Sequence, residues 1–162
     1  MNWQHLDAHT LKHIANAVNP FLTILLLGAI VWRRKSDAQF AAGRFIFGAL
    51  LAIVFAFVLG KANSIFKVWT GFPGDPGHYE FPSGHTCFAV AVATSLCLLD
   101  RHWLLLVLPL LAAYGALIVL PPLHFHSWLD VVGAWILTPP LALLCHKLRL
   151  VNRQDAKISR DD

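Results

Sequence analysis

The feature that most constrains this chain is a series of long apolar stretches that contain almost no charge. Hydrophobic side chains make up 57% of the 162 residues and charged side chains only 14%. A soluble domain of this length has no use for so much apolar surface, whereas roughly 17–25 apolar residues in a helix cross a hydrocarbon core of ~30 Å. The sequence therefore predicts a single membrane domain, residues 1–162, folded as an all-α polytopic helical bundle.

Charged residues, prolines and glycines divide the chain into one amphipathic segment and five spans. Residues 2–18 are expected to form a short amphipathic helix that lies at the membrane interface. Pro139 and Pro140 are expected to kink the last span or to end its regular part early. The predicted transmembrane spans are residues 20–32, 45–60, 83–99, 103–120 and 127–145, followed by a charged tail at 146–162.

Basic residues are distributed unevenly between the two sides of the predicted bundle. Lys12, Lys61 and Lys67 fall on one side. The other ten of the 13 basic residues fall on the opposite side: Arg33, Arg34, Lys35, Arg44, Arg101, Lys147, Arg149, Arg153, Lys157 and Arg160. By the positive-inside rule the richer side, with the tail, is cytoplasmic, and the loops at 61–85 and 121–127 share the outer face. This topology explains the net charge of +4, which does not indicate nucleic-acid binding.

Three histidines repeat every four residues in the N-terminal segment. His5, His9 and His13 therefore share one face of the predicted interfacial helix. A solvated polar face is the favoured interpretation, and a metal-binding or pH-sensing stripe is the alternative.

A short polar motif, Pro82-Ser83-Gly84-His85, opens the third predicted span. Proline is tolerated at a helix start, serine caps the first-turn N–H groups, and glycine lets a ligand approach the backbone closely. His85 can give or take a proton near neutral pH. The motif predicts an anion site at a helix N-terminus with an acid–base group beside it, and an ordinary turn with a helix cap is the alternative.

A second polar pair, His126 and Asp130, lies at the start of the fifth predicted span. The two residues are four apart, so their side chains stack on one helix face. An Asp there accepts a hydrogen bond from one imidazole nitrogen, fixes the tautomer and leaves the other nitrogen as a nucleophile or base. A structural pair that only joins two helices is the alternative, but ionisable groups inside a membrane are costly and tend to be functional.

Together, these groups fit in-line displacement at phosphorus. His85 and His126 lie at the mouths of two predicted helices, and Lys61 lies at a third helix end. In such a reaction one histidine attacks the phosphorus and the other protonates the departing oxygen.

The motifs resemble those of the type-2 phosphatidic acid phosphatase superfamily of membrane lipid phosphatases, and the resemblance covers roughly residues 45–146. That family is recognised by three patterns, K-x6-R-P, P-S-G-H and S-R-x5-H-x3-D. The second pattern is intact here as Pro82-Ser83-Gly84-His85. The first keeps Lys61, and the third keeps His126 and Asp130.

The resemblance assigns a role to each of these residues. It implies that His126 is the phosphorylated nucleophile, that Asp130 orients it, and that His85 protonates the leaving group. The residues implied to hold the phosphate are Lys61, Ser83 and Gly84. No metal or other cofactor is implied.

Both family arginines are replaced in this chain. The R-P pair of the first pattern is Val68-Trp69, and the S-R pair of the third is Val119-Leu120. A charge-assisted hydrogen bond is worth ~1.5–3 kcal/mol, so losing two costs on the order of 10²–10⁴ in rate. Three residues of the predicted outer loops could supply positive charge instead, the histidines only when protonated: Lys67, His78 and His124.

Three classes of function follow, and the first is favoured. It is a lipid phosphatase that hydrolyses a phosphomonoester or diphosphate of a lipid through a phosphohistidine, in a bacterial inner membrane with the site facing the periplasm or exterior. Its partners would be the phosphorylated lipid and membrane lipids, without nucleic acid. The second class is a non-catalytic binder or carrier of anionic lipid. The third, a metal or haem site, would use four histidines but leaves Pro82-Ser83-Gly84 unexplained: His78, His85, His124 and His126.

Overall fold

The described part of the protein is entirely helical. The computed structural model describes residues 8–61, 81–121, 123 and 125–161, with side chains for 9–60, 81–121, 123 and 125–147. Within these ranges there is no strand, and the predicted all-α bundle is confirmed. The elements are α1 (Ala8–Ser36), α2 (Ala42–Lys61), α4 (Gly84–Leu99), the 3₁₀ turn η2 (Arg101–Trp103), α5 (Leu104–Val119) and α6 (Trp128–Asp161).

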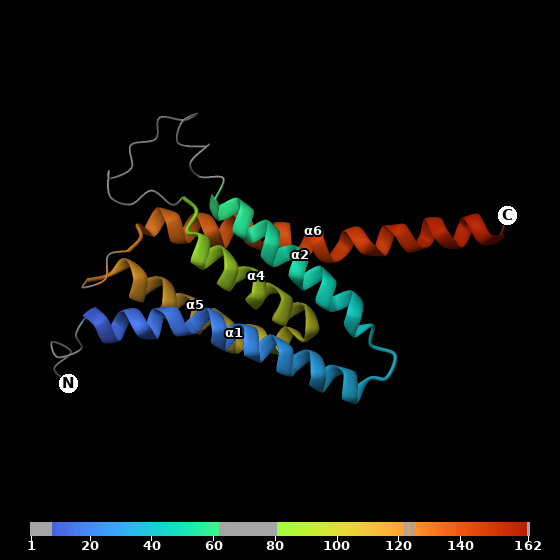
Figure 1. Ribbon diagram of the computed structural model, residues 1–162, viewed down its shortest axis with the longest axis horizontal. Helices are drawn as coiled ribbons and strands as arrows, with labels where there is room; N and C mark the ends of the chain where they lie inside the picture. The colour runs from blue at the N-terminus through green and yellow to red at the C-terminus, as the bar shows by residue number, and fades with distance from the viewer. Residues whose placement is uncertain (1–7, 62–80, 122, 124, 162) are drawn as a thin grey trace, which may run out of the picture.

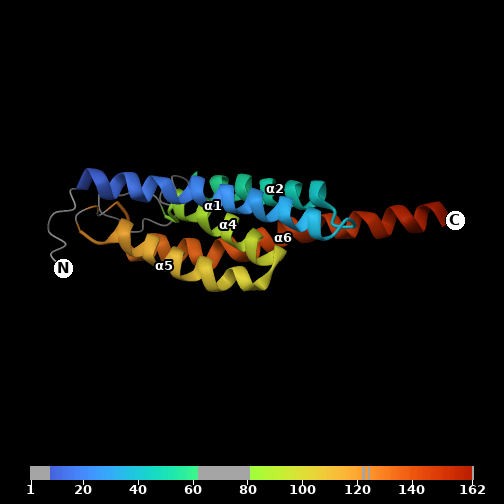
Figure 2. The same cartoon turned by 90° about the horizontal axis from the view of Figure 1, so that it is seen from below.

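The helices alternate in direction along the long axis of the molecule (Figures 1 and 2). Helices α1, α4 and α6 run one way, and α2 and α5 run the other. As a result, α2 and α5 finish at the end of the bundle where α4 and α6 begin. We call this the motif end, because it carries the starts of α4 and α6. The opposite end, which we call the basic end, carries Arg33, Arg34, Lys35, Arg44 and Arg101.

Four helical segments are long and apolar enough to cross a membrane: His9–Ser36, Ala42–Gly60, Arg101–Val119 and Trp128–Lys147. Each carries large apolar side chains on its outer surface, among them Leu27, Phe57, Leu105 and Ile136. Helix α4, predicted as a span, has 16 residues and is about 24 Å long, shorter than a ~30 Å hydrocarbon core. The fold is therefore that of an all-helical membrane bundle with one short apolar helix.

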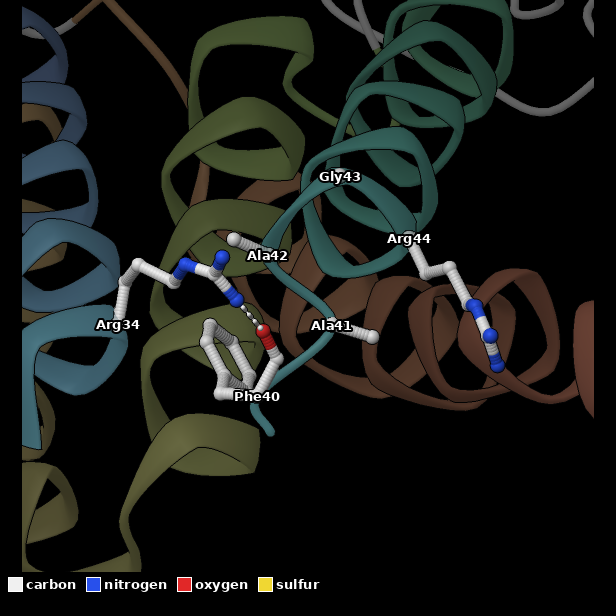
Figure 3. A pocket seen from close by; sticks show the side chains of 6 residues that line it. All are labelled: Arg34, Phe40, Ala41, Ala42, Gly43 and Arg44. Carbon is white, nitrogen blue, oxygen red and sulfur yellow. Dashed lines mark hydrogen bonds between the residues drawn. The ribbon is translucent and has the colours of Figure 1, made fainter. Parts of the chain in front are cut away.

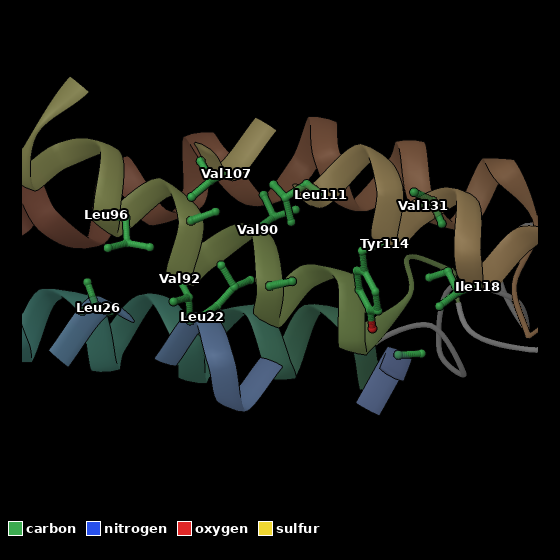
Figure 4. Packing of buried hydrophobic residues seen from close by; sticks show 14 of the residues in the cluster. Leu22, Leu26, Val90, Val92, Leu96, Val107, Leu111, Tyr114, Ile118 and Val131 are labelled. Atoms are coloured by element: carbon green, nitrogen blue, oxygen red, sulfur yellow. The ribbon is translucent and has the colours of Figure 1, made fainter. Parts of the chain in front are cut away.

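Helix α4 lies at the centre of the bundle. It contacts α1, α2, α5 and α6, and of its residues only His85 and Leu98, near its two ends, are exposed. Figure 4 shows Val90, Val92 and Leu96 of α4 packed between side chains of the surrounding helices. Those labelled neighbours are Leu22 and Leu26 of α1, Val107, Leu111, Tyr114 and Ile118 of α5, and Val131 of α6.

Residues 8–18 do not form a separate interfacial helix, and this corrects the expectation for residues 2–18. They are the first three turns of α1, which continues through Pro20 to Ser36. The reason is a buried apolar stripe that runs along the whole helix: Ala15, Leu22, Leu26 and Ile30. Pro20 is exposed, away from this stripe, so the packing continues although one backbone hydrogen bond is lost. Residues 2–7 lie outside the described residues.

Helix α6 also continues past the point where a break was expected. It includes Pro139 and Pro140 and extends as a helix to Asp161, so the predicted charged tail is helical as far as that residue. Thr138 and Ala142, on either side of the two prolines, are fully buried. Packing therefore holds the helix across the two missing N–H groups. Figure 1 shows the last turns of α6 projecting beyond the basic end.

A hollow of about 530 Å³ lies beside the connection between α1 and α2, at the basic end (Figure 3). Arg34 reaches across it and donates hydrogen bonds from Nη1 to the carbonyls of Ala38 (2.9 Å) and Phe40 (3.1 Å). In Figure 3 the side chain of Arg44 extends away from Arg34. The two guanidinium groups do not converge, and the role of Arg34 is to fix the turn into α2.

Candidate active site at the motif end

The start of α4 is capped as the sequence predicts. The hydroxyl of Ser83 accepts hydrogen bonds from the Thr86 backbone N–H (3.3 Å) and the Thr86 hydroxyl (3.0 Å). Both side chains are fully buried. Ser83 is therefore the N-cap of α4, and Thr86, which sequence reasoning did not single out, completes the cap. In this arrangement the Ser83 hydroxyl serves the helix rather than an open anion site.

The segment before α4 is docked on the start of α6. The Ser83 backbone N–H donates to the Asp130 carbonyl at 3.2 Å. One turn further along α6, a Cβ atom added at Gly133 would overlap the ring of Phe81. These two contacts bring the helix start that carries His85 beside the helix start that follows His126.

The carboxylate of Asp130 has a structural task that was not predicted. Its Oδ2 accepts from the Ser127 backbone N–H at 2.8 Å, and the Asp130 N–H donates to the Ser127 hydroxyl at 3.3 Å. This reciprocal pair is a capping box at the start of α6. The sequence signal, an S-x-x-D pattern before an apolar run, was available in Ser127-Trp128-Leu129-Asp130.

His126 and Asp130 are close, but the expected hydrogen bond between their side chains is not formed. His126 Nδ1 lies 3.9 Å from Asp130 Oδ2, within reach for an ion pair and too far for a hydrogen bond. The His126 and Asp130 side chains are 11% and 9% exposed, respectively. Because the nearer carboxylate oxygen caps Ser127, the imidazole faces a carboxylate that is already fixed in place.

Lys61 ends α2 directly beside the start of α4. A Cβ atom added at Gly60 would overlap the Cα of Gly84, so the two helices touch backbone to backbone there. This contact requires glycine at position 60 and brings the last turn of α2 to the motif. The side chain of Lys61 lies outside the described part of the structure.

We expect Gly60→Ala to destabilise the protein, because the atom that a new Cβ would meet belongs to backbone and cannot rotate away. Overpacking of this kind costs typically ~1–3 kcal/mol. Thermal unfolding of the detergent-purified protein measures the effect. Gly28→Ala is the matched control, since a Cβ there meets open space and alanine favours a helix. Equal unfolding temperatures for the two variants would contradict the close contact.

A residue of α1 that the sequence did not indicate also reaches the site. Asn19 Nδ2 donates to the His85 carbonyl at 3.3 Å, across 66 residues of sequence. Asn19 Oδ1 is buried and has no hydrogen-bond partner among the described residues. In the sequence, Asn19 precedes Pro20 and looks like a helix opening, so no local pattern signals the contact.

The remaining predicted residues are placed as follows. His85 is exposed and Gly84 half-buried, both in the first turn of α4. The first-motif positions Val68-Trp69 and the candidate cations Lys67, His78 and His124 lie outside the described residues. Across the described ranges, no three His, Cys, Asp or Glu side chains gather as a metal site would require.

The positions of the third-motif S-R pair end α5 at the motif end. Val119 is buried, whereas Leu120, the C-cap residue of α5, is 49% exposed. A longer polar side chain at position 120 therefore has room, and one at position 119 does not.

Comparison with known proteins gives no relative: the chain matches no protein-family model, no curated protein and no solved structure.

Proposed function

We propose that this protein is a metal-independent phosphatase that removes phosphate from a phosphomonoester or diphosphate of a lipid at the outer face of the membrane. The resemblance of Pro82-Ser83-Gly84-His85 and of the His126–Asp130 pair to type-2 phosphatidic acid phosphatases suggests the chemistry. The observation that carries the proposal is the hydrogen bond from the Ser83 N–H to the Asp130 carbonyl. It joins two motifs 47 residues apart at the same end of the bundle, which the chemistry requires.

In the proposed first step, His126 attacks the phosphorus and a P–N bond forms while the P–O bond to the lipid alcohol breaks. His85 gives its proton to the departing oxygen. Nδ1 of His126 faces Asp130, so Nε2 is the nitrogen that we assign to the attack. The fixed carboxylate stabilises the positive charge that develops on the ring.

In the second step, water attacks the phosphohistidine. The P–N bond breaks, His85 takes a proton from the water, and inorganic phosphate leaves. His85 is exposed, so water and a phosphate group can reach the start of α4, and the His126 side chain is 11% exposed beside it. Both histidines return to their starting protonation states, so the cycle closes without a cofactor.

A second candidate is a non-catalytic binder or carrier of anionic lipid. Two observations favour it: the Ser83 hydroxyl is fully buried as a helix cap, and Leu120 stands where the family has an arginine. A binding protein needs a pocket that accepts an anion, but it does not need the family arginines that hold the phosphoryl oxygens. Such a protein would bind lipid phosphates and release none.

Phosphate release from lipid substrates separates the two candidates. We expect the purified protein to release inorganic phosphate from at least one member of a panel of lipid monophosphates and diphosphates. The activity should be unaffected by a chelator, because the proposed chemistry uses no metal. Binding of the panel lipids without any release would instead establish the binder.

The proposal places the motif end outside the cell, and cysteine labelling tests this. In a version with Cys87, Cys97 and Cys145 replaced by alanine, we expect Pro121→Cys to react with an impermeant maleimide on intact cells. Asp37→Cys, at the basic end, should react only after lysis. The positive-inside rule supports this orientation, because most basic residues lie at the Asp37 end. The reverse labelling pattern would put the site in the cytoplasm.

A further inference from the structure

Helix α1 extends well beyond the start of α4 at the motif end. The hydrogen bond from Asn19 to the His85 carbonyl puts these residues at the same level of the bundle. Asn19 lies about three turns into α1, so roughly 16 Å of helix continue past that level. Figures 1 and 2 agree, because in both views α4 begins further along the long axis than α1 does. The first turns of α1 therefore project past the start of α4 and lie along one side of the candidate site.

One basic residue in these turns, Lys12, lies on the side of α1 that faces the site. Lys12 and Asn19 are seven residues apart, which puts them on one stripe of the helix to within about 20°. Since Asn19 contacts α4, Lys12 also lies on the side of α1 toward α4, about 10 Å nearer the N-terminus. Its side chain is exposed and has a flexible four-carbon stem.

One motif position that would supply positive charge to the site is apolar. Leu120 takes the place of the third-motif arginine. Of the lysine and arginine side chains that the structure describes, Lys12 is the one that lies at the motif end. A phosphate dianion there needs cationic partners, and Lys12 is a described side chain that can act together with the retained motif lysine, Lys61.

Asn19 carries an independent sign of a missing ligand. Its amide nitrogen is used by the His85 carbonyl, while its Oδ1 is buried without a partner in the described ranges. A buried acceptor without a donor is costly, and such atoms in proteins are as a rule satisfied. The neighbouring group is His85, which in the proposed reaction hands a proton to the departing lipid oxygen. Because Asn19 bonds the backbone carbonyl of that same residue, the O–H of the new alcohol is the donor that we assign to Asn19 Oδ1.

We propose that α1 forms part of the substrate site: Asn19 accepts a hydrogen bond from the lipid alcohol, and Lys12 compensates the charge of the phosphate. This inference rests on the proposed phosphatase function. It makes the N-terminal turns of α1, which carry none of the family motifs, a substrate-binding element.

Steady-state kinetics of Lys12→Gln test the charge. We expect KM for the best lipid phosphate to rise about tenfold or more with kcat little changed, since the lysine acts on binding. The difference from wild type should shrink at high salt. His13→Gln, one residue away on the outer side of α1, and Lys35→Gln, which removes the same charge at the basic end, are the matched controls. Both controls should behave as the wild type.

Asn19→Leu tests the acceptor. We expect kcat/KM for the lipid phosphate to fall about tenfold, with a smaller fall for nitrophenyl phosphate, whose leaving group departs without a proton. An asparagine that only anchors α1 would show the opposite signature, a lower unfolding temperature and equal losses on both substrates. The variant removes the hydrogen bond to the His85 carbonyl together with the unsatisfied acceptor, and because these two losses have opposite effects on stability, the unfolding temperature should change little.

The outcomes distinguish this inference from the function on which it rests. An active wild type with Lys12→Gln and Asn19→Leu indistinguishable from the controls would overturn the role of α1 and leave the phosphatase standing. A wild type that releases no phosphate from any substrate would overturn both. Lys12 is exposed, so its variant should fold and remains decisive even if Asn19→Leu does not.

Discussion

Replacing His126 by alanine is expected to abolish phosphate release while the bundle stays folded. Removing the nucleophile of a covalent mechanism typically costs at least about 10⁴-fold in rate. His126 precedes α6 and is not part of the capping box, which is formed by Ser127 and Asp130. Thermal unfolding of the variant measures any structural cost separately, so the loss of activity can be read as chemical when the protein remains folded. Full activity in His126→Ala would rule out the phosphohistidine mechanism.

Two companion variants separate the chemistry from the helix cap. Asp130→Asn keeps an oxygen that can accept from the Ser127 N–H but loses the charge that faces His126. We expect it to lower kcat about 100-fold or more. Ser127→Ala removes the other half of the capping box and leaves the charge in place, so it should lower stability by ~1 kcal/mol with a much smaller effect on kcat. Equal losses of activity in the two variants would show that Asp130 acts only through the cap.

The second large effect is expected from Leu120→Arg, which restores the arginine of the third motif. The side chain at position 120 is half-exposed at the motif end, so a guanidinium can be placed there without being buried. Reinstating one charge-assisted contact to phosphate should raise kcat/KM about 10- to 100-fold. The measurement is phosphate release at pH 6 and at pH 8.

Whether the gain in activity from Leu120→Arg rises or falls with pH depends on which groups in the site are charged. If His78 or His124 helps to hold phosphate, it is protonated below the usual histidine pKa of ~6.5 and loses that charge as the pH rises. An arginine stays charged throughout, so Leu120→Arg should gain more at pH 8 than at pH 6. Pro121→Arg adds the same charge one position away and is the control. A folded Leu120→Arg protein with unchanged activity at both pH values would mean that position 120 does not face the phosphate.

The architecture could be read from the sequence where local rules decide. Apolar runs and their interruptions predicted the helices, and the Ser83 cap was predicted because capping depends on residues three apart. The single helix α1 was missed because Asn19-Pro20 resembles a helix start. The continuous helix is stabilised by a stripe of residues that is buried against neighbouring helices, chiefly α4, and burial of this kind is a tertiary effect.

The candidate site was predicted in part for the same reason. His85, His126 and Asp130 belong to short motifs, and the alternating directions of the helices bring those motifs to one end. The contact from Asn19 to His85 joins residues 66 positions apart and leaves no local pattern. The S-x-x-D pattern that begins at Ser127 is typical of a capping box, but a carboxylate four residues after a histidine equally fits a catalytic pair, so the pattern alone does not separate the two roles of Asp130.

The enclosure of α4 has a consequence for how the protein would respond to its membrane. A helix in contact with lipid tilts to match the hydrocarbon thickness, or the bilayer around it becomes thicker or thinner. Helix α4 is covered by α1, α2, α5 and α6, and its position is fixed by glycine packing and by hydrogen bonds to its neighbours. A thicker or thinner bilayer would act on α4 only through these four helices and would move the lipid headgroups relative to His85. We therefore expect the choice among lipids to depend on acyl-chain length as well as on headgroup chemistry.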